Sequence, residues 1–359
     1  MSRTSAISIF EDAENTQAKL NEIQAGVVEN LQKSGNSFKF KSQNSNLDEK
    51  AGSYNFKRFV NSEEKDYGTA RAAGKGDKIQ APEITVNLDK DKEIVEEVTK
   101  KDAERFGLDA SVISLLDKRK TNHQSTLKRN IEKDFWTEAY LGALCGDELK
   151  MKGKIVAGIS SGANAETIDS QLESAIIPLE KTENKFVNGV DRDFIGGVLD
   201  PNVYSKLKTR LNTLHNINFS VEDKELTGIN GVVMFSENYL PKKVDYIIMA
   251  KESVAQPVII DEYDCEKIPL SNDFAVELFS SRGTKTLAGD LIVVGITIDA
   301  THTKVVTVDA LPTTAANVAT DTIYIATKAV KIGDVDYNAG DMFTATKDGS
   351  TVTWTQYNV

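Results

Sequence analysis

The sequence predicts an α+β fold in which a central α/β region carries segments that lie outside its core. Three observations predict it. Apolar and polar residues alternate out and back between Tyr54 and Leu88, as in a β-hairpin. A helical stripe of apolar residues then runs from about Ala110 to Cys145. Short apolar runs follow from Asp193 onward, and the first of them leads into a helix that begins with Asp-Pro.

The composition limits the class of protein. The chain has 359 residues, 40% of them hydrophobic, which suffices for one large domain or a few smaller ones. Its 43 Lys and Arg against 54 Asp and Glu give a formal net charge of −11, which argues against sequence-specific binding to duplex DNA. Two cysteines make no disulfide framework, which is typical of a protein made in a reducing cytosol.

No membrane partner is expected from the sequence. The N-terminus lacks the apolar stretch of a signal peptide. The longest apolar runs, such as Leu291–Ile296, have the length of a strand and are too short to span a bilayer.

The N-terminal quarter of the chain is expected to form an arm followed by a loop. Residues 1–35 carry a weak helical pattern that Gly35 ends, which predicts the arm. Residues 36–93 are expected to be an extension loop. At its start, Phe38 and Phe40 alternate with polar residues, which predicts a short strand.

The hairpin within this loop has an apolar face but no core of its own. A two-stranded ribbon alone is marginal in water, and a long loop without a core usually has a function. We therefore expect a second copy of the chain to cover the apolar face, with the basic tip suited to acidic neighbours. The expected contact residues between subunits are Tyr54, Phe56, Arg71, Lys75, Lys78, Ile84 and Val86.

The middle of the chain is expected to combine long helices with strands. The helix that ends at Cys145 would be on the order of 50 Å long and act as a girder across the subunit. A second helix is expected at Ala165–Glu180. Asp200 is placed to cap a third helix whose first residue is Pro201. The stretch "KESVAQ", residues 251–256, is expected to be a short helix between two strands.

The C-terminal part differs in composition. Residues 296–359 are rich in Thr, favour strands, contain a "KDGS" turn and lack a helical pattern. This length is sufficient for a small all-β domain with its own core. We expect that domain to project from the surface, and a chain that ends at Gly295 still to fold and assemble.

One motif suggests catalysis. "GISSG" at Gly158–Gly162 matches the nucleophile elbow of serine hydrolases, with Ser160 as the candidate nucleophile. The histidines downstream of it are His215 and His302, and no oxyanion signature such as His-Gly-Gly-Gly is present. A serine hydrolase therefore remains an alternative, while the main prediction is a protein without catalytic, cofactor-binding or metal-binding residues.

The order of these parts resembles the major capsid proteins of tailed bacteriophages, which have the Hong Kong 97-type fold. Local phrases that carry the resemblance are "ITVNLDKDKEIVEEVTKKDAERFG", "KRNIEKDFWTEAYL", "DFIGGVLDPNVYSKLK" and "SSRGTKTLAGDLIVV". The resemblance covers about residues 1–295 and implies an N-terminal arm, an extended hairpin loop, a long spine helix and an α/β axial domain. The implied division is arm 1–35, extension loop 36–93, peripheral domain with spine helix 94–190, axial domain 191–295 and an additional β domain 296–359.

The resemblance also implies a function and partners. A structural protein of this family self-assembles as pentamers and hexamers, in the host bacterial cytoplasm, into an icosahedral head that becomes part of the virion. Its partners would be further copies of itself, a separate scaffolding protein, portal and head-completion proteins, and packaged double-stranded DNA held by nonspecific contacts. No cofactor is implied. An encapsulin-like nanocompartment shell is the alternative within the same fold.

Overall fold

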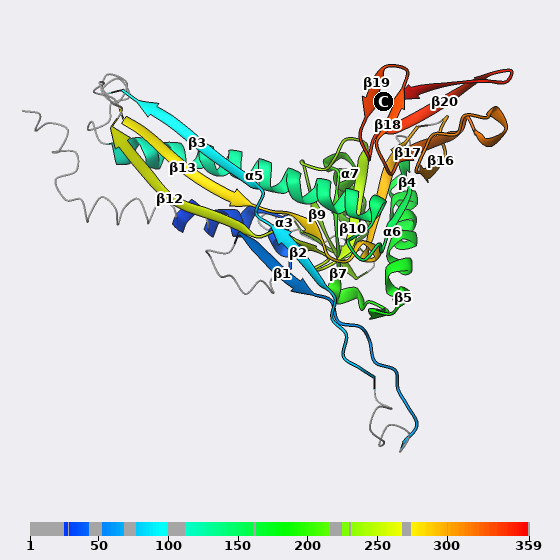
Figure 1. Ribbon diagram of the computed structural model, residues 1–359, viewed down its shortest axis with the longest axis horizontal. Coiled ribbons are helices and arrows are strands. Elements are labelled where there is room, and N and C mark those ends of the chain that lie inside the picture. The colour runs from blue at the N-terminus through cyan, green and yellow to red at the C-terminus, as the bar shows by residue number, and fades with distance from the viewer. Residues whose placement is uncertain are drawn as a thin grey trace, which may run out of the picture.

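The computed structural model describes residues 25–27, 29–42, 52–67, 77–99, 112–160, 163–215, 225–229, 231–267, 274–299 and 301–357. In Figure 1 a long helix runs along one side of the molecule, with a narrow sheet beside its first half and a wider sheet with two more helices at its second half. A hairpin extends away from the body, and a separate group of strands lies at the C-terminal end. The helices in these residues contain no stretch that is long and apolar enough to cross a membrane.

The central sheet has six strands in the order β4-β15-β10-β7-β9-β8. Its middle strand β10 is antiparallel to both neighbours, while β4 with β15 and β7 with β9 are parallel pairs. The strands span Lys154–Ser160 (β4), Ile195–Leu199 (β7), Glu225–Ile229 (β8), Val232–Ser236 (β9), Val244–Ala250 (β10) and Ile292–Ile298 (β15).

Helices cover both faces of this sheet. Helices α6 (Ala165–Glu180) and α7 (Pro201–His215) pack on one face, and the C-terminal half of α5 (Val112–Cys145) packs on the other. Side chains of β10 alternate between the two faces: Tyr246 and Ile248 lie on the α6 side, and Ile247 and Met249 lie on the α5 side. The central sheet is therefore buried on both faces.

The predicted helix starts are confirmed. α6 has the predicted bounds, and the Asn164 side chain caps it by accepting a hydrogen bond from the Thr167 N–H at 2.9 Å. α7 begins at Pro201, and the Asp200 carboxylate accepts from the Asn202 N–H at 2.9 Å. The long helix is also confirmed as far as the described residues reach, from Val112 to Cys145.

A second sheet lies along the N-terminal half of α5 (Figure 1). It consists of β12 (Val258–Lys267), β13 (Phe274–Arg282) and β3 (Lys90–Val98), all antiparallel. The Asp134 carboxylate on α5 binds Arg282 of β13 at 2.7 Å and Lys90 of β3 at 2.9 Å, which ties these two strands to the helix.

Each of the two sheets combines strands from predicted parts that follow one another in the sequence. β4 comes from the predicted peripheral part 94–190 but pairs in the sheet of the predicted axial part 191–295. Conversely, β12 and β13 from the axial part pair with β3. The domain division thus stays a prediction, and the strands do not separate along its boundaries.

Two short elements differ from the prediction. Residues 37–40 form a helical turn, α3 (Ser37–Phe40), rather than a strand. The ring of Phe40 fills the space above Gly196, where a Cβ atom would come within 2.7 Å of it, so its burial overrides the alternating pattern. The predicted helix at 251–256 is instead a turn that leads into β11 (Val254–Ala255), which pairs with β14 (Lys285–Thr286).

The C-terminal residues 301–357 form the predicted strands. β16 (Lys304–Val308), β17 (Thr322–Ala326), β20 (Met342–Asp348) and β21 (Thr351–Gln356) make one sheet, and β18 (Val330–Ile332) with β19 (Val335–Tyr337) make a small hairpin.

The segment has a small hydrophobic cluster of its own, formed by Val318, Tyr324 and Ala345, but it also contributes to the main core. Ile323 and Ile325 are fully buried in the same cluster as Trp136 of α5. The Tyr140 hydroxyl also donates to the Gly340 carbonyl at 2.8 Å. One face of the sheet is therefore buried against the carboxyl end of α5, and residues of the other face pack within the segment itself.

Candidate intersubunit surface

The base of the extension hairpin consists of two antiparallel strands, β1 (Ser53–Lys57) and β2 (Glu83–Asn87). Tyr54 lies opposite Val86, and Phe56 lies opposite Ile84. All four side chains are buried, and the alternation that predicts the hairpin is confirmed. The hairpin's inner face is therefore fixed by its sequence period of two.

The prediction that only a second copy covers this face is wrong at the hairpin base. Tyr54, Phe56 and Val86 pack on Ala255 and Leu287 of the same chain. The exposed fractions of the four candidate residues, between 1% and 7%, show that they have little surface left for a partner. β11 and the segment after β14 provide a platform beneath the hairpin that a local sequence pattern cannot reveal.

Beyond the base, the hairpin leaves the body. The two legs stay paired through Arg58 N–H to Pro82 O at 3.1 Å and Val60 N–H to Gln80 O at 2.9 Å. Residues 61–67 and 77–79 then extend away from the central sheet (Figure 1).

These legs carry exposed apolar side chains. Phe59 is 62% exposed, Ile79 is 87% exposed and Tyr67 is 91% exposed. Lys78, a predicted contact residue, is also exposed, whereas Arg71 and Lys75 lie outside the described residues. Large apolar groups on a projecting segment mark a surface that a partner covers. The candidate intersubunit surface is therefore the pair of legs, residues 58–67 and 77–82, rather than the hairpin base.

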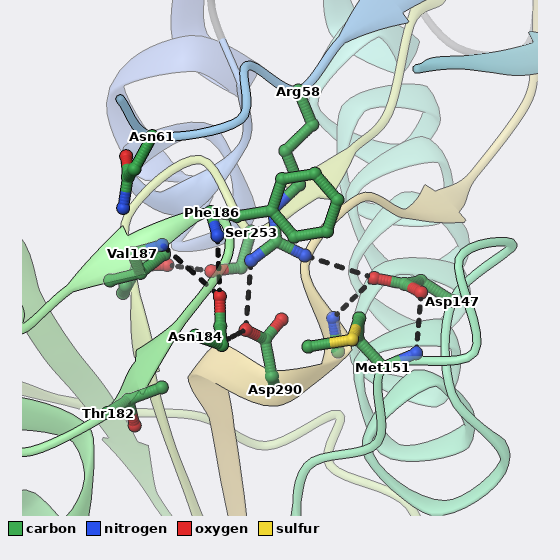
Figure 2. Close-up of polar contacts among 12 residues, drawn as sticks. Arg58, Asn61, Asp147, Met151, Thr182, Asn184, Phe186, Val187, Ser253 and Asp290 are labelled. Atoms are coloured by element: carbon green, nitrogen blue, oxygen red, sulfur yellow. Dashed lines mark hydrogen bonds and ion pairs between the residues drawn. The ribbon is translucent and has the colours of Figure 1, made fainter. Parts of the chain in front are cut away.

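Arg58 anchors the legs to the body (Figure 2). Its guanidinium donates to Asp290 at 2.9 Å and to Asp147 at 3.3 Å, and it lies 4.5 Å from the centre of the Phe186 ring. The side chains of Asp147 and Asp290 are 0% and 8% exposed. A buried arginine with two carboxylates fixes the direction in which the legs leave, because any other direction would leave buried charge unpaired.

Neighbouring groups hold the two carboxylates in place. Asn184 donates to Asp290 at 2.6 Å, and the Met151 N–H donates to Asp147 at 2.9 Å (Figure 2). Burial raises the pKa of Asp147 above its usual value, although the amide N–H groups and Arg58 favour its charged form. A second link joins the Asn61 N–H to the Lys185 carbonyl at 2.8 Å, in the turn between β5 (Glu183–Asn184) and β6 (Val187–Asn188).

Two sequence signals could have identified this surface. Tyr54, Phe56 and Arg58 are two positions apart, so their side chains lie on the same face of the extended chain. The pattern therefore predicts that the charged Arg58 side chain faces inward with the two aromatic rings. Phe59 is out of phase with Phe56 and therefore faces outward. The partners of Arg58, which stand 89 and 232 positions away, carry no local signal.

The hydrolase candidates lie elsewhere. Ser160 ends β4, and His215 ends α7, with both side chains outside the described set. His302 lies 2.9 Å from the carboxylate of Asp299 and edge-on to the ring of Tyr357. These contacts give His302 a part in holding the loop between β15 and β16.

Comparisons with known proteins give matches to solved structures alone, since no family model and no curated protein sequence matches the chain. The capsid structure of the cyanophage P-SCSP1u superposes with a TM-score of 0.51 at 14% identity, over 70% of this chain and 84% of that chain. A structure from Mycobacterium phage Che8 gives a TM-score of 0.49 at 17% identity, over 68% and 85% of the two chains. A virus-like particle from Pyrococcus furiosus gives 0.41 at 16% identity, over 67% and 85%.

At these identities a superposition shows the fold alone. The TM-score of 0.51 with the cyanophage capsid shows a common fold over 70% of this chain. The chain has the α+β fold of tailed-phage capsid proteins, the Hong Kong 97 type.

Proposed function

We propose that this protein is the major capsid protein of a tailed bacteriophage, which assembles into the icosahedral head around the phage DNA. The observation that carries the proposal is the anchored pair of legs with exposed Phe59, Tyr67 and Ile79. Exposed apolar side chains do not stabilise a monomer. Burying them would contribute a free energy of about 25 cal/mol for each Å² of apolar surface removed from water. A neighbouring subunit that covers the legs recovers this free energy.

The proposal includes the organisation of the particle. Pentamers and hexamers of the chain would form the shell, with a separate scaffolding protein, a portal and head-completion proteins as further partners. Because the net charge of −11 disfavours extensive contact with DNA, we confine the nonspecific contact with DNA to the inner face of the shell. We place the C-terminal strands on the outer surface, since the inside of a head is filled with DNA. The area buried per subunit would reach several thousand Å², roughly the range of obligate assemblies.

Removing the legs tests the proposal. Val60 and Gln80 face each other through a hydrogen bond, so residues 61–79 can be replaced by Asn-Gly, which closes a two-residue hairpin. The shortened chain should keep its circular dichroism spectrum and melting temperature, because the base and the Arg58 anchor remain. Electron microscopy should show particles for the unaltered protein and none for the shortened chain.

A control of equal length distinguishes the effect of the length of the legs from the effect of their apolar side chains. A variant with residues 61–79 replaced by a Gly/Ser segment of equal length keeps the reach but loses Tyr67 and Ile79. It should also fail to form particles. Normal particles from either variant would rule out the legs as the contact between subunits.

The contents of native particles distinguish the phage head from the nanocompartment. Nuclease-protected double-stranded DNA of genome length supports the head. An enzyme cargo without such DNA would assign the chain to a nanocompartment shell instead.

A further inference from the structure

The segment before the extension hairpin, residues 35–42, docks into the body and is here called the arm joint. Ser37 and Phe40 are 0% and 1% exposed. The Phe40 carbonyl accepts from the Glu252 N–H at 2.7 Å, and the Ser42 N–H donates to the Val254 carbonyl at 2.9 Å. The arm joint thus connects the N-terminal helical residues to the hairpin through contacts with the central body.

A fully buried carboxyl group on α5 receives this joint. Glu132 is 0% exposed and accepts from the Ser37 N–H at 3.1 Å and the Ser37 hydroxyl at 2.8 Å. It also accepts from the Trp136 indole N–H at 2.8 Å. A Cβ atom on Gly35 would lie 2.8 Å from a Glu132 oxygen, so the joint closes directly over the carboxyl group.

A second buried carboxyl group holds the adjacent residue of the joint. Glu237, 3% exposed, follows β9 and accepts from the Asn36 side-chain amide at 2.8 Å and from the Tyr239 N–H at 3.0 Å. Asn36 and Ser37 are neighbours, so the joint bridges two carboxyl groups that repel each other when both are charged. The other charged groups that face this region are Lys39, Lys41, Lys128 and Glu252.

We propose that Glu132 and Glu237 form a proton-sensitive latch, which holds the arm joint when one proton is bound and loosens it when both carboxyl groups are charged. Glu237 lines a cleft of about 530 Å³, which places one member of the pair beside solvent. The charged residues that line the same cleft are Asp200, Lys206, Lys242, Lys243 and Asp245. The latch goes beyond the proposed function, and it operates within one chain whether or not that chain builds a shell.

The direction of the pH effect follows from linkage. Burial, and then the charge of Glu237, raises the pKa of Glu132 from 4.5 to about 7 in the docked state, and these two effects outweigh the hydrogen bonds from Ser37 and Trp136, which lower the pKa. The docked state therefore binds a proton that the released state has lost, so docking weakens as the pH rises from about 5 to about 7.5. Burial lowers the pKa of Lys41 to about 8, which acts in the opposite direction but only at higher pH.

Hydrogen exchange of the full-length protein, measured by mass spectrometry at pH 5.5 and 7.5, tests the latch. After correction for the intrinsic pH dependence of exchange, protection of peptides that cover residues 35–42 should fall about tenfold between the two values. Peptides from β10, in the middle of the central sheet, should show no such change. Equal protection of the arm joint at both pH values overturns the proposal.

Variants identify the responsible groups. Glu132→Gln keeps an acceptor oxygen without a charge, so the arm joint should be protected equally at both pH values. Glu138→Gln is the matched control: Glu138 is a carboxyl group on the same helix that binds Thr286 instead, and the pH effect should persist. A pH effect that survives in Glu132→Gln contradicts the latch. If Glu132→Gln does not fold, Glu237→Gln should reduce the pH effect by removing the repulsion, and an unchanged effect again contradicts it.

Discussion

The sequence predicts that both the extension hairpin and the C-terminal strands lie outside the main core. The two regions differ in the structure in what covers their apolar faces. The hairpin divides in two: its base packs on Ala255 and Leu287 of its own chain, while its legs project into solvent. The C-terminal strands instead share the main core, where Ile323 and Ile325 are fully buried. An alternating pattern shows that a segment has an inner face, but it does not show what covers that face.

The difference arises from how much apolar surface of the same chain lies next to each region. The C-terminal sheet lies against the carboxyl end of α5, and β16 runs close to β4, the edge strand of the central sheet. Covering an edge strand also protects its backbone groups from pairing with other chains. The hairpin has an apolar platform under its first five residue pairs, whereas its legs, past the contacts of Arg58 and Asn61, extend away from the body (Figure 1).

The largest effect is expected from removing the C-terminal strands. A chain that ends at Ile298 loses four side chains from the shared core, each worth about 1.5–3 kcal/mol of burial, against a total stability of about 5–15 kcal/mol. These residues are Ile323, Ile325, Met342 and Tyr357. Such a chain should be insoluble or lack a cooperative thermal transition. A soluble truncated chain with a sharp melting curve would restore the independent domain that the sequence predicts.

Two phenylalanines on the same side of the hairpin, one in the base and one in a leg, compare these two parts directly. Phe56 is 7% exposed and Phe59 is 62% exposed. Phe56→Ala should lower the free energy of unfolding by about 3 kcal/mol, because it leaves a cavity. Phe59→Ala should change it by about 0.5 kcal/mol or less but reduce particle yield. Urea titration of unassembled protein measures the first quantity, and similar losses from both variants would remove the distinction.

The Arg58 anchor should have a similar or slightly smaller effect. Arg58→Ala leaves Asp147 and Asp290 buried without their cation, at a cost of about 3 kcal/mol. The pKa of Asp147, already raised by burial, should rise further, so the variant should regain stability as the pH falls through that raised pKa.

Lys57→Ala is the control for this anchor. The neighbouring Lys57 pairs with Glu83 at 3.2 Å on the exposed face, and such pairs contribute about 0.5 kcal/mol. Its loss should leave thermal stability almost unchanged. An Arg58→Ala variant as stable as Lys57→Ala would show that the legs need no buried anchor.

The elements whose apolar pattern is local could be predicted from the amino-acid sequence alone. The period of two between Tyr54 and Leu88 predicted the hairpin, and the period near four predicted α6 with its bounds and α7 with its Asp-Pro start. These succeed because backbone geometry alone sets which side chains share a face. The order of such elements also sufficed for the resemblance to a capsid fold.

Which residues cover the apolar face of each element depends on contacts between distant segments, and it became visible in the folded chain alone. The helical turn at Phe40 depends on Gly196, and the burial of Glu132 depends on Ser37, which stands 95 positions away. The same holds for Arg58 and its carboxylates. Contacts between distant segments leave no periodic trace in either segment, because each partner is chosen by the shape and charge of a surface that exists only after folding.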